Sequence, residues 1–131
     1  MTSKNQIKLS IGEIIEIYNI LIDLSLIKTC MWKVIGENID ILYPFYKEYS
    51  EYEYSLLKKH ANLDENGNPI IVNKKAHFGS NEKLLAYTED LNTEKLKEVN
   101  IVFKTEKMKK DFYDEPHSVN TINKLKNIIL K

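Results

Sequence analysis

The sequence contains no arginine, so all nineteen of its basic side chains are lysines. The arginine guanidinium is a planar fork that binds phosphates and carboxylates through two hydrogen bonds and that reads guanine in DNA. Any site that depends on such a fork is therefore excluded. An AT-rich genome, which favours Lys, Asn and Ile codons, also explains why arginine is absent.

Cysteine and long apolar runs are scarce as well. Cys30 is the only cysteine, so the chain has no internal disulfide and needs no oxidising compartment. The most apolar run, Ile14 to Ile27, is interrupted by polar residues and is too short to cross a bilayer. Met1 to Ser10 lacks the apolar core of a signal peptide. We therefore expect a cytoplasmic protein of a bacterial host cell, without a membrane partner.

Charge of either sign is not in excess, because nineteen acidic residues balance the nineteen lysines. Such a chain has no global field that would steer it to nucleic acid or to anionic lipid. Its 131 residues and 43% hydrophobic content predict one folded domain over residues 1–131.

Metal and cofactor signatures are also missing. The three histidines, His60, His77 and His117, have no spacing that a helix or hairpin would turn into a ligand set. The segment from Asp64 to Asn68 imitates the first ligands of a calcium loop, but Pro69 occupies the position where that loop needs glycine. The sequence predicts a turn there, and neither a metal nor a cofactor.

The strongest pattern that is present is an apolar stripe at steps of three or four residues. Its members are Met31, Ile35, Ile39, Leu42, Phe45, Tyr49, Tyr52 and Leu56. This spacing predicts a single long helix over roughly 29–62, kinked before Pro44. Such a helix buries its stripe only against a partner helix, from the same chain or from a second copy, so a homo-oligomer is one expected state.

The beginning of the chain predicts a partner for that helix. Ser10 and Glu13 form a capping box that starts an N-terminal helix. Before it, Ile7 to Leu9 is extended, and its expected neighbour is the alternating strand Val99 to Phe103. The predicted fold is α+β and mainly α, with the long Pro-kinked helix packed antiparallel on the N-terminal helix, a two- or three-stranded sheet and a C-terminal helix.

The remaining segments complete this prediction. Asn66-Gly67 predicts a tight turn with both residues at positive φ, followed by a short strand from Ile70 to Val72. A third helix is expected over 81–92, a helical turn over 105–111, and a last helix capped by Ser118. The side chains expected to face inward from the third helix are Leu84, Leu85, Thr88 and Leu91.

The order of these pieces resembles a family of small, functionally uncharacterised proteins of tailed bacteriophages and prophages of low-GC Gram-positive hosts. The residues that carry the resemblance are Ile7 to Ser10 with Glu13 to Asn19, Leu42-Tyr43-Pro44 leading to Tyr49 and Leu56-Leu57, the turn Asp64 to Asn68, and Leu91-Asn92-Thr93 with Val99-Asn100-Ile101. The resemblance implies a phage origin and supplies no activity or catalytic residue.

Two groups of residues qualify as contact sites. The first combines tyrosines beside the stripe with interleaved carboxylates, and comprises Tyr43, Tyr46, Glu48, Glu51, Glu53 and Tyr54. Tyrosines anchor protein interfaces, whereas carboxylates repel phosphate, so we expect a protein partner with a basic surface there. The second group consists of the lysines Lys104, Lys107, Lys109 and Lys110, which are candidates for contact with phosphate or are simply a solvated face.

No serine, carboxylate pair or glycine-rich loop has the pattern of a catalytic site. We therefore expect a non-enzymatic phage protein that binds a host or phage protein, with inhibition of a host defence system or host enzyme as the leading hypothesis. A virion or tail-assembly accessory protein and a nucleotide-signal sponge are the alternatives. Nucleic acid is the least favoured partner.

Overall fold

The computed structural model describes residues 6–126 and 128–130, and the contacts within the chain group into two compact units. Unit 1 comprises the described residues up to Tyr46 and from Glu98 onward, and unit 2 comprises Lys47–Lys97. The structure is 57% helical with small two-stranded sheets, which confirms the mainly α prediction. The elements are β1 (Gln6–Ser10), α1 (Ile11–Ser25), α2 (Trp32–His60), β2 (Ile71–Val72), β3 (Lys75–Ala76), α3 (Asn81–Lys95), β4 (Glu98–Val102), α4 (Lys110–Tyr113) and α5 (Val119–Lys126).

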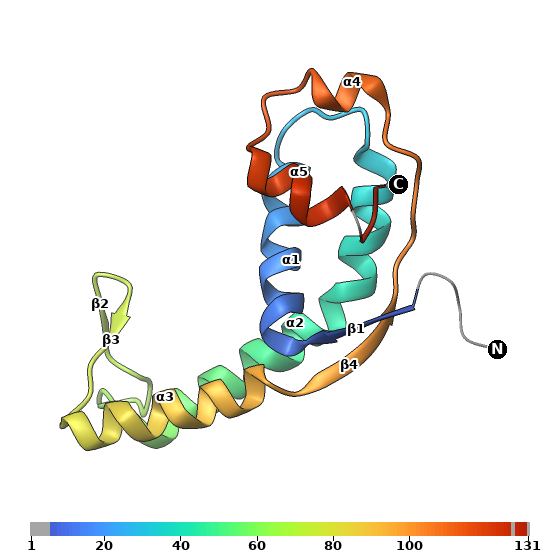
Figure 1. Cartoon of the computed structure of the whole chain (residues 1–131). Helices are drawn as coiled ribbons and strands as arrows, with labels where there is room; N and C mark the ends of the chain where they lie inside the picture. Colours follow the sequence, from blue (N-terminus) through green and yellow to red (C-terminus); the bar gives the residue numbers. More distant parts are fainter. Residues whose placement is uncertain (1–5, 127, 131) are drawn as a thin grey trace. The chain divides into compact units, whose positions relative to one another are not determined.

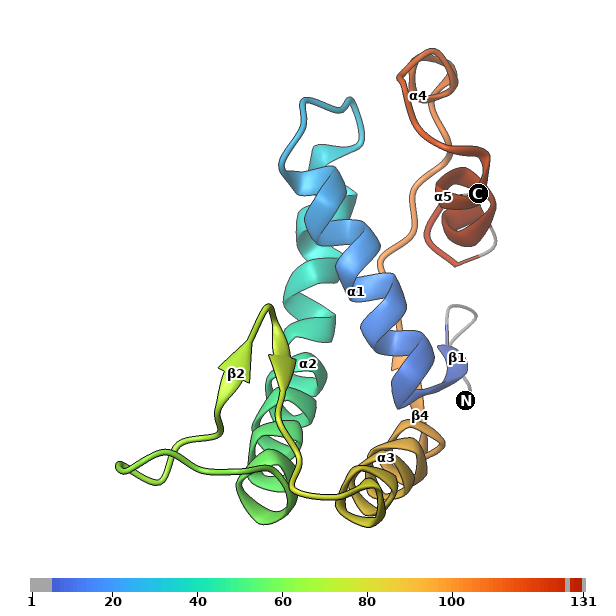
Figure 2. The same ribbon diagram turned by 90° about the vertical axis from the view of Figure 1, so that its left-hand side faces the viewer.

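Unit 1 is built on an antiparallel pair of helices, α1 and the first half of α2 (Figures 1 and 2). The predicted capping box starts α1: the Ser10 hydroxyl accepts from the backbone N–H of Glu13 at 3.2 Å, and the Glu13 carboxylate accepts from the backbone N–H of Ser10 at 3.2 Å. The rings of Tyr18 on α1 and Tyr46 on α2 stack with centroids 4.3 Å apart. The predicted helix pair is therefore confirmed.

The sheet of unit 1 pairs β1 with β4 in the antiparallel register that places Ile7 opposite Ile101 and Leu9 opposite Val99. Leu9 and Ile101 are buried, while their neighbours along the strands are exposed or half-buried, as period-two alternation requires. The predicted pairing of these two segments is confirmed, and the sheet that they form has two strands.

The apolar stripe faces inward, because each of its eight members is buried or half-buried. Seven of them lie in α2, and Met31 immediately precedes the helix. The helix is continuous through Pro44, which confirms one helix rather than two. The boundary between the two units falls between Tyr46 and Lys47, within α2 and two residues after Pro44.

The C-terminal part of unit 1 departs from one prediction. The expected helical turn over 105–111 is wrong, since this segment is extended up to Lys109 and only then forms α4. The backbone N–H of Glu106 donates to the carbonyl of Ile129 at 3.0 Å, and this long-range bond holds the segment extended. The last helix, α5, begins after Ser118, whose hydroxyl accepts from the Thr121 backbone N–H as predicted.

Unit 2 contains the second half of α2, a β2–β3 hairpin and α3. The tight turn with two consecutive positive φ angles joins β2 to β3 at Asn73 (53°) and Lys74 (66°), and the prediction for Asn66-Gly67 is wrong because only Gly67 has a positive φ. In that earlier turn the Asp64 carboxylate accepts from the backbone N–H groups of Asn66 and Asn68, which holds Asn66 in an ordinary conformation.

The inward face of α3 also differs from the prediction. Leu84, Leu85 and Thr88 are exposed, and among the four residues expected to face inward only Leu91 is half-buried. Tyr87 and Asp90 are half-buried in their place, so the helix is rotated relative to the expectation. Because this inward face is partly polar, the periodicity of apolar residues in the sequence does not indicate it.

Candidate functional site

The predicted tyrosine and carboxylate site divides between the two units. In unit 1, Tyr43 is exposed, whereas Tyr46 is half-buried against Tyr18, which corrects the expectation that Tyr46 is an exposed anchor. In unit 2, Glu48 and Glu51 are exposed as expected.

The other two members of that site have partners of their own in unit 2. The Tyr54 hydroxyl donates to the side-chain oxygen of Asn68 at 3.1 Å, and the Lys58 ammonium lies 5.3 Å from the centre of the Tyr54 ring. Glu53 is half-buried, and its carboxylate contributes to the raised pKa of Tyr49. Glu53 therefore belongs to the packing of unit 2 rather than to an exposed acidic surface.

Glu53 is the centre of a partly buried cluster that also contains the phenols of Tyr49 and Tyr87. Burial, and then the charge of Glu53, raise the pKa of Tyr49 well above its ordinary value of 10. The same two causes raise the pKa of Tyr87 on α3. Both phenols stay protonated, and the carboxylate is engaged with them. This cluster connects the second half of α2 to α3 within unit 2.

The predicted lysine group lies in unit 1, and its members are exposed. The ammonium of Lys109 is engaged, because it donates to the carbonyl of Cys30 at 3.3 Å and lies 3.8 Å from the carboxylate of Glu106. The backbone of Lys104 is also fixed, as its N–H donates to the side-chain oxygen of Asn38 at 2.8 Å and its carbonyl accepts from the Asn38 amide at 2.9 Å. Lys107 and Lys110 keep the exposure that a phosphate contact would need.

A cluster of Cys30, Glu115 and His117 lies in the same unit, where the loop before α2 meets the segment after α4. One Glu115 oxygen accepts from the Cys30 backbone N–H at 2.8 Å, and the other accepts from Nε2 of His117 at 2.7 Å. The His117 ring stacks on Phe112 with centroids 4.5 Å apart, and its side chain is almost wholly buried. Sequence reasoning missed this cluster because 85 positions separate Cys30 from Glu115.

The electrostatics of this cluster identify an anchor rather than a nucleophile. Burial alone raises the pKa of Glu115, but hydrogen bonds from Thr29, Cys30 and His117 outweigh it and hold that pKa at about 2. Burial, and then the hydrogen bond and charge of Glu115, raise the pKa of the Cys30 thiol. A cysteine nucleophile needs a lowered pKa and an adjacent base. Here the carboxylate lies between the thiol and the imidazole, so the arrangement does not activate Cys30.

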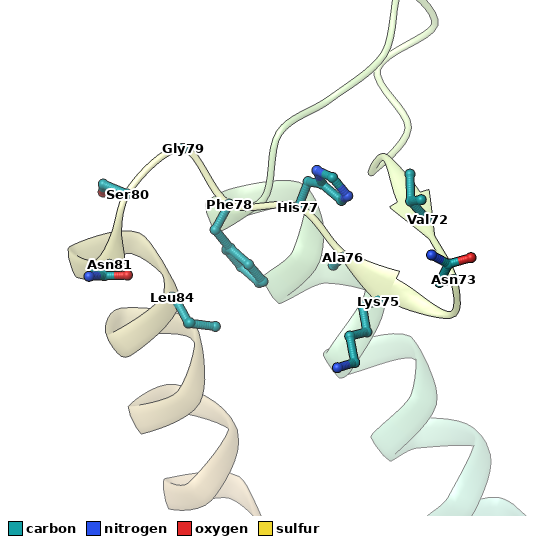
Figure 3. A pocket seen from close by; sticks show the side chains of 10 residues that line it. All are labelled: Val72, Asn73, Lys75, Ala76, His77, Phe78, Gly79, Ser80, Asn81 and Leu84. Carbon is teal, nitrogen blue, oxygen red and sulfur yellow. The ribbon is translucent and has the colours of Figure 1, made fainter.

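The pocket in unit 2 lies between the β2–β3 hairpin and the beginning of α3 and has a volume of about 720 Å³ (Figure 3). Phe78 and Leu84 point into the space between the hairpin and α3 (Figure 3). The residues that line it are Val72, Asn73, Lys75, Ala76, His77, Phe78, Gly79, Ser80, Asn81 and Leu84.

Local hydrogen bonds give this pocket its shape. The backbone N–H of His77 donates to the carbonyl of Ile70 at 3.0 Å, and the His77 carbonyl accepts from the N–H of Asn62 at 2.8 Å. The Ser80 hydroxyl caps α3 by accepting from the backbone N–H of Lys83, and the Phe78 ring lies 5.2 Å from that of Tyr87. The wall of the pocket is thus fixed by backbone bonds on one side and by ring packing on the other.

Apolar side chains are exposed on the hairpin and on α3, and two of them, Val72 and Leu84, line the pocket. Ile71 and Val72 on the hairpin are 52% and 47% exposed, and Leu84 and Leu85 on α3 are 42% and 59% exposed. We call these four residues, together with the pocket, the hairpin surface. Apolar side chains that surround a hollow and alternate with amide and lysine groups are typical of a surface that binds another protein.

Among residues 6–126 and 128–130, no group of three or more His, Cys, Asp or Glu side chains could hold a metal ion. In the same part of the chain, none of the helices combines the length and the apolar character needed to cross a membrane. No family model matches this chain, and no curated protein and no solved structure shows a significant similarity to it.

Proposed function

We propose that this chain is a phage-encoded, non-enzymatic protein that acts by binding another protein, and that its partner is a component of a host defence system or another host enzyme. The observation that carries the binding role is the hairpin surface of unit 2, where four apolar side chains remain in contact with water and two of them, Val72 and Leu84, line a pocket. The phage origin rests on the sequence resemblance described above.

The physical argument is the free energy gained when such side chains leave water. Each square ångström of apolar surface that is covered contributes roughly 25 cal/mol, and a few central apolar anchors dominate the affinity of most protein interfaces. Leu84 and Val72 supply anchors beside the hollow, while Asn73, Lys75 and Asn81 supply polar groups around it. A partner that inserts an apolar side chain into this pocket matches both features.

The exposed acidic part of α2 is a second proposed contact in unit 2. Glu48, Glu51 and Tyr54 keep the exposure that the sequence analysis expected of them. Their charge suits a partner with a basic, nucleic-acid-binding channel, as a defence nuclease has.

Affinity purification of the tagged chain from infected cells tests this proposal. The Leu84→Gln/Leu85→Gln double variant should lose the partner, because glutamine keeps the helix propensity of these positions but removes the apolar anchors. Leu96→Gln is the matched control, since Leu96 is 76% exposed in unit 2 but is not among the residues that line the pocket. A third arm replaces Glu48 and Glu51 with lysine.

The identity of the captured material decides between the classes of function. A host protein that the control retains and the double variant loses supports the proposal. Phage structural proteins alone would instead indicate a virion or tail-assembly accessory protein, and a small nucleotide alone would indicate a sponge. Equal capture by the double variant and the unaltered chain would contradict a role for the hairpin surface. The variant with lysine at positions 48 and 51 would then show whether the partner binds to the acidic part of α2 instead.

A further inference from the structure

The loop between α1 and α2 in unit 1, together with the first residue of α2, exposes three large apolar side chains within seven positions. Leu26 is 78% exposed, Ile27 46% and Trp32 71%. We call Leu26, Ile27 and Trp32, with the intervening Lys28 and adjacent Lys33, the helix-hairpin tip. In two perpendicular views of unit 1 the loop lies at the opposite end of α1 from β1 (Figures 1 and 2).

The backbone of this tip is held in place by the residues between the exposed ones. Thr29 and Met31 are buried, and the Met31 backbone N–H donates to the Thr29 hydroxyl at 3.3 Å. The Cys30 N–H donates to Glu115, and the Cys30 carbonyl accepts from Lys109. The alternation of anchored and exposed residues therefore presents the apolar side chains to solvent on a fixed backbone.

The charged residues of the tip itself are lysines. Residues 25–36 contain Lys28 and Lys33 and no acidic residue, and both lysines are exposed. The contact between Lys109 and Cys30 brings the segment 104–114 beside the loop. Together with Glu115, which accepts from the Cys30 N–H, that segment contains four lysines and four acidic residues, so it adds no net charge.

We propose that the helix-hairpin tip docks on the surface of a bilayer that contains anionic phospholipids, in contrast to the expectation from the sequence that the chain has no membrane partner. Tryptophan is enriched at the membrane–water interface, where its ring lies at the level of the headgroups, and exposed leucine and isoleucine gain from contact with the acyl boundary. Lysines beside such apolar groups are attracted to anionic headgroups. This role is independent of the hairpin surface in unit 2 and goes beyond the function proposed above.

The size of the tip favours a lipid surface over a protein partner. Each side of a stable protein interface covers about 800 Å² from some twenty to thirty residues. Three apolar side chains with two lysines are far fewer than that. A bilayer needs no complementary surface, so a small apolar group with a basic border is sufficient for reversible attachment.

The fluorescence of Trp32 gives a direct test, because it is the only tryptophan in the chain. The full chain is mixed with vesicles of phosphatidylcholine alone or with about one third phosphatidylserine. With the anionic vesicles we expect the Trp32 emission to move to shorter wavelength and the chain to sediment with the lipid. High salt should weaken both signals, because it screens the lysines.

Variants assign the binding to the tip. Leu26→Ser should weaken sedimentation with anionic vesicles about tenfold, because an exposed leucine no longer enters the acyl boundary. Leu96→Ser is the matched control, since Leu96 is 76% exposed in unit 2, and it should bind as the unaltered chain does. Lys28→Gln and Lys33→Gln should each weaken binding about fivefold. Far-ultraviolet circular dichroism checks that each variant is folded.

Three outcomes would overturn the inference: no emission shift with anionic vesicles, sedimentation without a shift, or equal binding by Leu26→Ser and Leu96→Ser. A shift of Trp32 on addition of a purified protein partner, with none on vesicles, would make the tip a protein contact instead. None of these outcomes bears on the hairpin surface, whose test uses Leu84 and Leu85. The two proposals therefore fail separately.

Discussion

Replacement of Glu115 by glutamine should destabilise unit 1 strongly at neutral pH and hardly at all in acid. The carboxylate accepts from the Cys30 backbone N–H at 2.8 Å and from His117 at 2.7 Å, and its side chain is only 17% exposed, so water screens it weakly. Glutamine has the same size and keeps one oxygen. Its amide group, however, places a donor opposite one of those two donors.

The lowered pKa of Glu115 sets the magnitude of this effect. The difference between the ordinary value of 4.5 and the value of about 2 in the folded chain corresponds to roughly 3 kcal/mol of unfolding free energy. Because the pKa is lower in the folded state, this stabilisation is fully present above pH 4.5 and is lost as the pH falls toward 2. For a chain of this length, 3 kcal/mol lowers the melting temperature by about 12 °C.

Urea unfolding of the unaltered chain and of Glu115→Gln, followed by circular dichroism at pH 7, 5 and 3, measures this effect. We expect a difference of roughly 3 kcal/mol at pH 7 that persists at pH 5 and shrinks at pH 3. Glu98→Gln is the control, since Glu98 is an exposed carboxylate 4.0 Å from Lys8, and exposed pairs contribute little. A difference that stays constant from pH 7 to pH 3, or that is no larger than for Glu98→Gln, would refute the reasoning.

Two further predictions concern single positions. Asn38→Leu should lower the unfolding free energy by about 2–4 kcal/mol in urea titrations, because Asn38 is wholly buried and its loss leaves the Lys104 backbone N–H and carbonyl unpaired. A loss of unfolding free energy no larger than that caused by substitution of an exposed residue would contradict the role of this side chain. Lys74→Gly should raise the stability of unit 2 by about 0.5–1 kcal/mol, since Lys74 has a φ of 66° that glycine adopts without strain. Lys75→Gly, in the adjacent strand, is its control and should be destabilising.

The elements that could be predicted are those whose determinants lie close together in the sequence. The capping box needs only Ser10 and Glu13, and the stripe of α2 repeats an apolar residue at each turn. The β1–β4 pair was predictable because both segments have the alternation of apolar and polar residues that is typical of a half-buried strand. Each segment was therefore the expected pairing partner of the other. In these cases local preference and final packing agree.

The failures lie where distant or polar contacts decide the structure. The segment 105–111 has residues that favour a helix, yet the bond from Glu106 to Ile129 holds it extended. The inward face of α3 is formed by Tyr87 and Asp90, and Asp90 lies 3.1 Å from His60, a pairing that apolar periodicity does not report. Asn38 does leave a signal, since it is a polar residue on the buried side of the α2 stripe.

The predicted contact sites show the same division. The exposure of Tyr43, Glu48 and Glu51 follows from their position beside the stripe, and the structure agrees with it. The burial of Tyr46 and Glu53 depends on Tyr18 and on Tyr87, which lie on other helices. The hairpin surface was not predicted, because it forms only when the Asn73-Lys74 turn and the Ser80 cap bring two weakly patterned segments together.

The register of β1 against β4 determines the order in which a ribosome can complete the two units. Gln6 pairs with Val102, so all of unit 2 is synthesised between the two strands of unit 1. Unit 2 can close its own contacts while β1 still has no strand to pair with. Closure of unit 1 then joins residues that are 88 to 96 positions apart, which places it among slow, non-local folding steps. Until then β1 is exposed to other chains. A nascent chain that stops before Glu98 should therefore hold a formed unit 2 and an unfinished unit 1.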